Sequence, residues 1–310
     1  FGRTLDYEFS YGDEVVITQE IYPFHFRHID AIEKSFMHDR NAHVVDNDPL
    51  YYDAFNECGL AMAGLNFVGN AAYYDIEEGK DNIAQFEFIL GFLELVQIFE
   101  EAKTALIHMN LTNTPYSEQF PLAQLHWIIA DKDSCIVVES MKDGLHVYDN
   151  PVGVVTNNPP FPSQMFALNN YAGVSRKQPE STFAGVLQLD AYTEEWVEWE
   201  YLEIFPASQD FESCLYKLNS ISGEEEDESV SQFFHILDRR SAAWMLEVTE
   251  GKYEITIYTS CCNTAKGIYY YTTYDNHQIT AVDMHAENLD SDQLICYPLL
   301  SKGEVRWQNK

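Results

Sequence analysis

The chain has 310 residues, of which 46% are hydrophobic, and its 50 acidic and 18 basic residues give a formal net charge of −32. This excess of carboxylates argues against binding to nucleic acid or to an anionic membrane surface, because both carry charge of the same sign. Aromatic residues make up 14% of the chain, which excludes a disordered protein. No apolar run approaches the ~20 residues of a membrane span and no signal peptide is visible, so we predict a cytoplasmic protein.

The first third of the chain predicts strands at 15–18, 24–26 and 60–67, where apolar residues are bounded by turn-forming ones. A helical block follows, which either Asp81 or Asn82 can cap. Its apolar residues recur at helical spacing and are Phe86, Ile89, Leu90, Leu93, Val96 and Ile98.

A second helix is predicted around 102–107 and ends at the turn 113–115. Strands then return as a meander with Asp-Lys-Asp, Lys-Asp-Gly and Asn-Pro turns between them. A third helical region is predicted over 209–246. It is interrupted by the acidic run 223–228, which we interpret as a solvated loop entering the helix at Ser229. The predicted strands of the meander are 125–130, 135–139, 145–148 and 152–156.

The chain ends in further strands, predicted at 253–259, 267–274, 278–283 and 294–297. Antiparallel hairpins therefore flank two helical layers, without the regular alternation of strand and helix that parallel sheets need. This order predicts an α+β sandwich. Since no repeat and no Pro/Ser-rich linker interrupts it, we predict one domain over residues 1–310.

The six cysteines lie in strand-like or helix-like settings, and none forms a CxxC pair. Adjacent Cys261 and Cys262 are poorly placed to bind one ion, so we predict reduced, mostly buried thiols. No two of the ten histidines have the spacing of metal ligands on a helix. We interpret His126, which lies in a predicted strand, as a core residue. The sequence predicts no metal site and no cofactor.

Four polar residues stand where predicted strands end. Arg3 and Asp6 open the chain, Asn66 follows Ala63-Gly64-Leu65, and Asn157 lies in the run Thr156 to Pro159. Each has an ordinary explanation when taken singly. An Arg and an Asp three residues apart commonly form a structural ion pair, and an Asn at a strand end commonly forms a turn.

Each of these residues belongs to a longer segment with a recognisable pattern. The segments are FGRTLD (1–6), NECGLAMAGLNF (56–67), LHWIIAD (125–131), DNPVGVVTNNP (149–159), QFFHIL (232–237) and YYYTTY (269–274). In this order they resemble the choloylglycine hydrolase family, specifically the bile salt hydrolases of gut bacteria, over nearly the whole chain. The resemblance implies the four-layer αββα sandwich of antiparallel sheets that N-terminal nucleophile hydrolases share.

The resemblance also implies a reaction. In the family, processing exposes a cysteine as the first residue, and its thiolate attacks an amide carbonyl. Its own α-amine titrates near ~7.7–8.0 and serves as the base. In bile salt hydrolases the bond that is cut joins a steroid acid to glycine or taurine. Conjugated bile salts are therefore the implied substrates, without a cofactor, and a homotetramer is the implied assembly.

By the same resemblance, the four polar residues take roles around the nucleophile. Asp6 would hold the α-amine through a charge-assisted hydrogen bond, and Arg3 would favour the thiolate. Asn66 would donate to the oxyanion, and Asn157 would orient the amine and the substrate amide. Positions that match sterol-contacting loops, and that ordinary loop packing explains equally well, are Leu5, Tyr52, Tyr116 and Phe120.

The sequence departs from the family pattern in three places. The family's Met-Cys start and first strand should precede Phe1, so we expect the chain as written to lack the nucleophile and to be inactive. Where the family carries an Arg after Pro-x-Ser, this chain has Gln209, which can hydrogen-bond but brings no charge. Where relatives have a glycine-rich loop, segment 192–201 is rich in aromatic residues and glutamates, which is expected to alter the pocket rim.

Two other functions remain open at this point. A penicillin V acylase relative would use the same chemistry on another amide, although Asn66 argues against it, because that branch tends to place Tyr there. A non-catalytic binder would keep the sterol pocket and lack turnover, which the missing nucleophile and Gln209 both favour.

Overall fold

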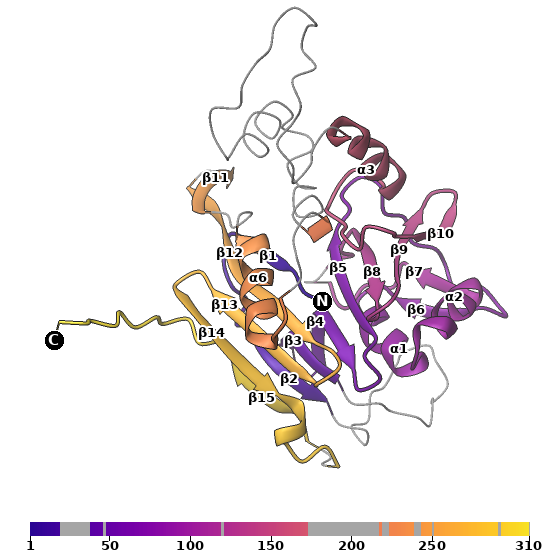
Figure 1. Ribbon diagram of the computed structural model, residues 1–310. Helices are drawn as coiled ribbons and strands as arrows, with labels where there is room; N and C mark the ends of the chain where they lie inside the picture. The colour runs from indigo at the N-terminus through magenta and orange to yellow at the C-terminus, as the bar shows by residue number, and fades with distance from the viewer. Residues whose placement is uncertain are drawn as a thin grey trace, which may run out of the picture.

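Two antiparallel sheets lie face to face in the computed structural model, and α-helices cover their outer faces (Figure 1). Strand β1 (Thr4–Tyr7), near the start of the chain, and β15 (Ile295–Pro298), near its end, both belong to this sandwich, and the last described residues extend away from it (Figure 1). The structure describes residues 1–18, 38–45, 48–118, 121–172, 217–218, 223–238, 243–249, 251–290 and 293–309.

The first sheet, sheet A, joins the start of the chain to its last third. Its strands in spatial order are β1 (Thr4–Tyr7), β12 (Lys252–Asn263), β13 (Ile268–Thr273) and β14 (Asn276–Asp283), and β11 (Ala243–Thr249) also pairs with β12. Helix α6 (Glu226–Asp238) covers the outer face of this sheet, where Val230 and Phe234 pack against Cys261.

The second sheet, sheet B, has eight strands and supplies most of the core. Helices α1 (Phe88–Leu95) and α2 (Phe99–His108) cover its outer face. In spatial order its strands are β10 (Gly144–Asp149), β9 (Cys135–Met141), β8 (Leu125–Ala130), β5 (Ala61–Asn66), β4 (Asp48–Asn56), β3 (His38–Val45), β2 (Glu14–Thr18) and β15 (Ile295–Pro298). Smaller elements are β6 (Asp81–Ala84), β7 (Met109–Thr112), α3 (Phe161–Ala167), η1 (Leu168–Tyr171) and η3 (Met284–Ala286).

Alternation along the strands builds the layers, because successive side chains of a strand point to opposite faces. On β2, Val15 and Ile17 pack toward sheet A, whereas Val16 packs in the cluster that contains α1. On β12, Cys262 faces sheet B and Cys261 faces α6. Helices, sheet B, sheet A and α6 therefore form the four layers of the predicted αββα sandwich, which is confirmed.

The predicted helix over 81–98 is wrong at both ends. Residues 81–84 form β6, which pairs in parallel with β7, and α1 begins only at Phe88. Asn82 does not cap a helix, because its side chain bonds the backbone of Glu77 and accepts from Asn110 Nδ2 at 2.7 Å. The second helix ends at His108 rather than at the turn 113–115, since the chain continues directly into β7.

The predicted strand 152–156 is also wrong, because side chains take the backbone groups that a strand would pair. Asn150 Oδ1 accepts from the Val152 and Gly153 N–H groups at 3.2 and 2.8 Å, and Nδ2 donates to the Val154 carbonyl at 3.0 Å. The segment therefore turns away from the sheet. Farther along, residues 243–249 form β11 where the helical region was predicted to continue. The predicted strand 24–26 lies outside the described residues.

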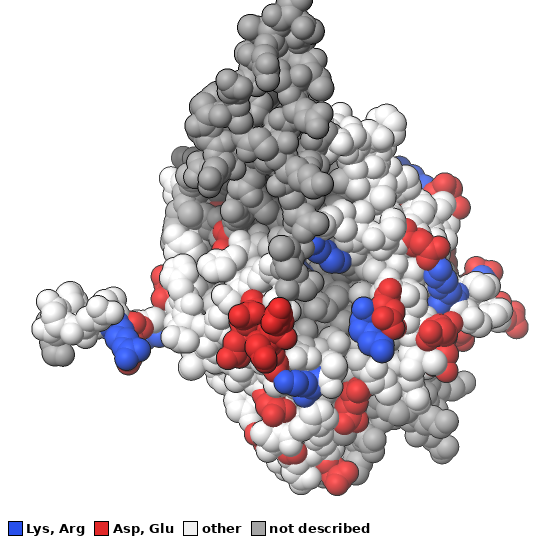
Figure 2. Space-filling view, in the orientation of Figure 1, with Lys and Arg blue, Asp and Glu red and all other residues white. Residues whose placement is uncertain are grey.

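The second half of the acidic run, residues 226–228, belongs to a helix that starts three residues before the predicted Ser229, and only residues 223–225 precede it. Helix α6 begins at Glu226, whose carboxylate accepts from Tyr270 Oη at 3.0 Å and pairs with Lys266. Carboxylates in a first turn suit the positive end of the helix dipole. Figure 2 shows a large group of acidic atoms over α6, where Glu224, Glu225, Asp227 and Glu228 are exposed. In the described ranges, no helix is long and apolar enough to cross a membrane.

We expect Gly2→Ala to destabilise the junction of β1 with β12. A Cβ at this position would meet the Ser260 carbonyl oxygen at 2.1 Å, so the strands must separate. Overpacking of this kind costs roughly 1–3 kcal/mol, measurable as a lower midpoint of urea unfolding by circular dichroism. Thr4→Ala, at the start of β1, removes one hydrogen bond of 3.4 Å and is the milder control. Equal midpoints for both variants would contradict the prediction.

Candidate active site

A cavity of about 1530 Å³ opens beside β1, at the end of β5 and along the loop 150–157. Its size exceeds the roughly 300–1,000 Å³ of common small-molecule pockets. Gln209, Phe120 and the segment 192–201 lie outside the described residues. The other predicted site residues all line this cavity, and they are Arg3, Leu5, Asp6, Tyr52, Asn66, Tyr116 and Asn157.

Arg3 reaches from sheet A to sheet B. Its Nε donates to the Thr4 carbonyl at 3.1 Å, and Nη1 donates to the Tyr52 carbonyl at 3.3 Å and to the Gly64 carbonyl. These acceptors lie on β1, β4 and β5. Because they are neutral carbonyls, they orient the guanidinium without cancelling its positive charge, which stays in the cavity wall.

Asp6 lies at a β-bulge, where the register between β1 and β12 shifts after Leu5. A bulge redirects side chains relative to a regular strand. Thr256 Oγ1 donates to Asp6 Oδ1, and Thr4 Oγ1 donates to Oδ2 at 3.4 Å. Hydroxyl donors from two strands therefore hold this carboxylate at the cavity.

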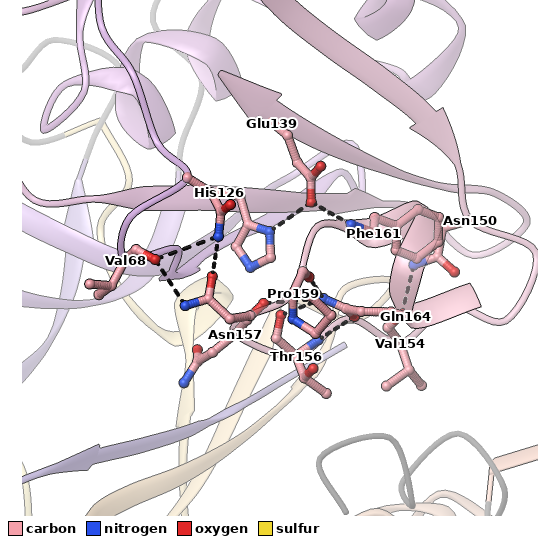
Figure 3. Close-up of polar contacts among 12 residues, drawn as sticks. Val68, His126, Glu139, Asn150, Val154, Thr156, Asn157, Pro159, Phe161 and Gln164 are labelled. Atoms are coloured by element: carbon pink, nitrogen blue, oxygen red, sulfur yellow. Dashed lines mark hydrogen bonds and ion pairs between the residues drawn. The ribbon is translucent and has the colours of Figure 1, made fainter. Parts of the chain in front are cut away.

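The two asparagines reach the cavity from different structural settings. Asn66 is the last residue of β5, where it pairs with Leu125, and its side chain is exposed. The four residues at the start of β5 are buried, so this strand gives Asn66 a rigid base. Asn157 is also exposed, but it lies in a loop that precedes a cis peptide bond between Asn158 and Pro159. Figure 3 shows polar contacts on both sides of this loop.

Apolar and aromatic side chains complete the wall of the cavity. Tyr116 meets Phe86 edge to face, with ring centroids 5.2 Å apart, and Ile89 and Leu5 also line the cavity. Burial raises the pKa of Tyr52 well above its ordinary value, so its phenol is neutral. This part of the wall suits a large apolar ligand with few polar groups.

Three aromatic residues that the sequence analysis missed also line the cavity. Tyr7, Phe9 and Tyr11 are 38%, 44% and 39% exposed, and the rings of Phe9 and Tyr11 lie 4.6 Å apart. Burial raises the pKa of Tyr11 to about 12. The alternation Tyr-Glu-Phe-Ser-Tyr at 7–11 was the available signal, because it places three aromatic side chains on one side of an extended segment.

Four cysteines in the described part of the chain are poor nucleophiles. Burial raises the pKa of Cys135, which lines the cavity, to about 12, and those of Cys261 and Cys296 to about 11. Burial also raises the pKa of Cys58. Since the thiolate is the reactive form, none of these four thiols substitutes for an activated cysteine. Within the same described ranges, no three His, Cys, Asp or Glu side chains gather as metal ligands.

Comparison with known proteins finds similarity to one family over nearly the whole chain. Residues 1–297 match the family described as linear amide C-N hydrolases, choloylglycine hydrolase family. The bile salt hydrolase/transferase of Lactiplantibacillus plantarum is 45% identical over 306 residues, which cover 98% of this chain and 94% of that protein. The bile salt hydrolase/transferase of Clostridium perfringens is 34% identical over 306 residues, covering 96% of this chain and 92% of that protein.

Solved structures agree with the layer order described above. A cysteine-to-alanine mutant of the conjugated bile acid hydrolase from Clostridium perfringens matches with a TM-score of 0.88 at 32% identity, covering 100% of this chain and 95% of that one. Penicillin V acylase from Agrobacterium tumefaciens matches with a TM-score of 0.70 at 16% identity, over 95% and 86% of the two chains. At that identity the second match shows a shared fold alone. This chain belongs to the choloylglycine hydrolase family of linear amide C–N hydrolases.

Proposed function

We propose that this protein hydrolyses conjugated bile salts at the amide bond between the steroid acid and glycine or taurine. The observation that carries the proposal is the meeting of Arg3, Asp6, Asn66 and Asn157 in one cavity with an apolar wall. These residues come from three distant segments of the chain. The names of the relatives at 45% and 34% identity support the choice of substrate.

The proposed reaction uses a cysteine that leads the strand before β1. Its sulfur bonds to the amide carbonyl carbon, the C–N bond breaks, and the α-amine passes a proton to the departing amino group. Asp6 holds the α-amine, Arg3 favours the thiolate, and Asn66 donates to the oxyanion. Asn157 orients the amine and the substrate amide. Water then hydrolyses the thioester and releases the steroid acid.

The sterol is proposed to lie against the apolar part of the cavity wall. Leu5, Tyr52 and Tyr116 face this space, and Phe9 and Tyr11 stand at its exposed side. A steroid offers rigid apolar faces, and burying these against aromatic rings is favourable by roughly 25 cal/mol per Å² of apolar surface. Phe120 and Gln209 are proposed to belong to the same site by family resemblance.

The direct test uses a protein in which a Cys-led first strand precedes Phe1, and it measures release of taurine from taurocholate and of glycine from glycocholate. We expect both products from this Cys-led protein and a higher rate when Gln209→Arg is added. A Cys→Ala version is the matched control. Release of phenoxyacetate from penicillin V without release of taurine would replace the proposal with an acylase. Taurocholate binding without any product would replace it with a non-catalytic binder.

We further propose a single domain over 1–310 that works in the cytoplasm as a homotetramer. Family resemblance supports the assembly, and the net charge of −32 suits a freely soluble cytoplasmic enzyme. Sedimentation velocity at micromolar concentration tests the assembly, and a monomer at every concentration would contradict it.

A further inference from the structure

We propose that Gln164 and Glu139 are positioning residues that hold Asn157 at the cavity. The inference rests on the proposed function, because Asn157 meets substrate only in that role. Neither residue belongs to the segments from which the family resemblance assigned catalytic roles. Both act from behind the cavity wall, through the backbone of the loop that carries Asn157.

The loop needs such support because it has no strand or helix of its own. Asn157 is exposed on the cavity, between the turn at Asn150 and the start of α3. A loop side chain that must orient a substrate requires fixed backbone on both sides, since a misplacement of about 1 Å can cost on the order of 10²-fold in rate.

Gln164 supplies this support with both ends of its amide. Its Oε1 accepts from the Thr156 N–H at 3.1 Å. Its Nε2 donates to the carbonyls of Thr156 and Asn157, each at 3.1 Å, and to that of Pro159 at 2.7 Å. Gln164 is 3% exposed, so these bonds do not compete with water. The loop backbone is therefore bonded before, at and after Asn157 (Figure 3).

Glu139 fixes the helix that carries Gln164. Its Oε1 accepts from the backbone N–H of Phe161, the first residue of α3, at 2.8 Å. His126 Nδ1 lies 3.2 Å from the same oxygen, and the His126 ring stacks on Phe67 at 4.4 Å. Glu139 and His126 are fully buried on neighbouring strands β9 and β8. A continuous chain of contacts thus runs from sheet B through α3 to Asn157.

The placement of these residues rules out direct contact with substrate. Arg3, Asp6, Asn66 and Asn157 line the cavity, whereas Gln164, Glu139 and His126 are absent from its described lining. Any effect of Gln164 on substrate must therefore pass through the loop. This makes Gln164 a positioning residue, and it predicts that its effect disappears once the Asn157 side chain is removed.

Gln164→Glu is the sharpest probe, because it keeps the shape and removes the donors. A carboxylate still accepts from Thr156 N–H but faces three carbonyl oxygens without a proton to share. Gln124→Glu is the matched control. The Gln124 side chain accepts from Gly69 N–H at 2.6 Å, so the same change there retains the bond. Gln164→Asn, which is neutral but too short to reach, replaces Gln164→Glu if the latter does not fold.

The test combines two measurements on the full chain. Amide hydrogen exchange by mass spectrometry should be about tenfold faster across 154–161 in Gln164→Glu and unchanged in Gln124→Glu. Calorimetry with taurocholate should show affinity about fivefold weaker for Asn157→Ala and for Gln164→Glu. The double variant should bind no more weakly than Asn157→Ala alone, because both changes remove one interaction.

Two results would overturn the inference. One is unchanged exchange across 154–161 in Gln164→Glu, which would show that Gln164 does not hold the loop. The other is additive loss of affinity in the double variant, which would show that Gln164 acts independently of Asn157. Failure of the unmodified chain to bind taurocholate would count against the proposed function instead, and the exchange measurement would then decide the role of Gln164 alone.

Discussion

In the Cys-led protein, Asn66→Ala is expected to lower kcat for taurocholate hydrolysis by about 10²–10³, with little change in KM. Asn66 ends the buried strand β5 and lines the cavity, so the backbone that carries its amide is fixed before substrate arrives. A preorganised donor of this kind stabilises the oxyanion more than the ground-state carbonyl, and its loss therefore appears in kcat.

Steady-state kinetics with taurocholate measures this effect. Asn113→Ala is the control, because Asn113 Nδ2 bonds the Asp75 carboxylate at 2.8 Å and lies outside the lining of the cavity. A rise in KM at constant kcat would assign Asn66 to substrate binding. A loss smaller than about tenfold in kcat would remove it from the oxyanion site.

Trp127→Ala is expected to lower the free energy of unfolding by about 3–5 kcal/mol. Trp127 on β8 is completely buried, and its ring meets Phe88 of α1 edge to face with centroids 4.8 Å apart. This contact joins sheet B to its helical layer. Removing the indole leaves a cavity that the rigid strands on either side, β5 and β9, cannot close.

Urea unfolding followed by circular dichroism measures the change. Trp127→Phe should cost much less, about 1–2 kcal/mol, because it keeps a ring against Phe88. Among the described residues, the indole Nε1 has no hydrogen-bond partner, so the phenylalanine loses no polar contact there. Similar unfolding midpoints for Trp127→Ala and the unchanged protein would show that the helical layer is held elsewhere.

Much of the sandwich follows from local pattern. The strands at 125–130 and 135–139 are short apolar runs around a turn of polar residues, and both occur as β8 and β9. The wrong predictions of helix and strand lie where the backbone forms hydrogen bonds with side chains or with segments that are distant in the sequence. Residues 81–84 become a strand because β7, which follows α2, lies beside them. Such a pairing leaves no periodic trace in the sequence, so the helical spacing of the apolar residues from Phe86 onward, with a capping residue at 81 or 82, extended the predicted helix over this strand.

The site was harder to predict than the fold. Asn66 and Asn157 look like turn formers, and only their flanking segments, matched to the family, connected them with Arg3 and Asp6. The structure brings them to one cavity. Gln164 could not be found in this way, because its importance comes from four hydrogen bonds to backbone atoms, and backbone N–H and carbonyl groups carry no residue-specific signal.

The position of Arg3 determines how experiments on its charge should be read. One guanidinium bonds carbonyls of β1 in one sheet and of β4 and β5 in the other. It therefore acts as a spacer between the layers as well as a source of positive potential. A substitution such as Arg3→Leu removes both properties at once, so a lost rate would report the changed spacing of the layers and the lost positive charge together. Arg3→Lys keeps the charge but cannot span the same three acceptors. Comparing Arg3→Lys with the unchanged protein therefore isolates the spacing, and comparing Arg3→Leu with Arg3→Lys isolates the charge.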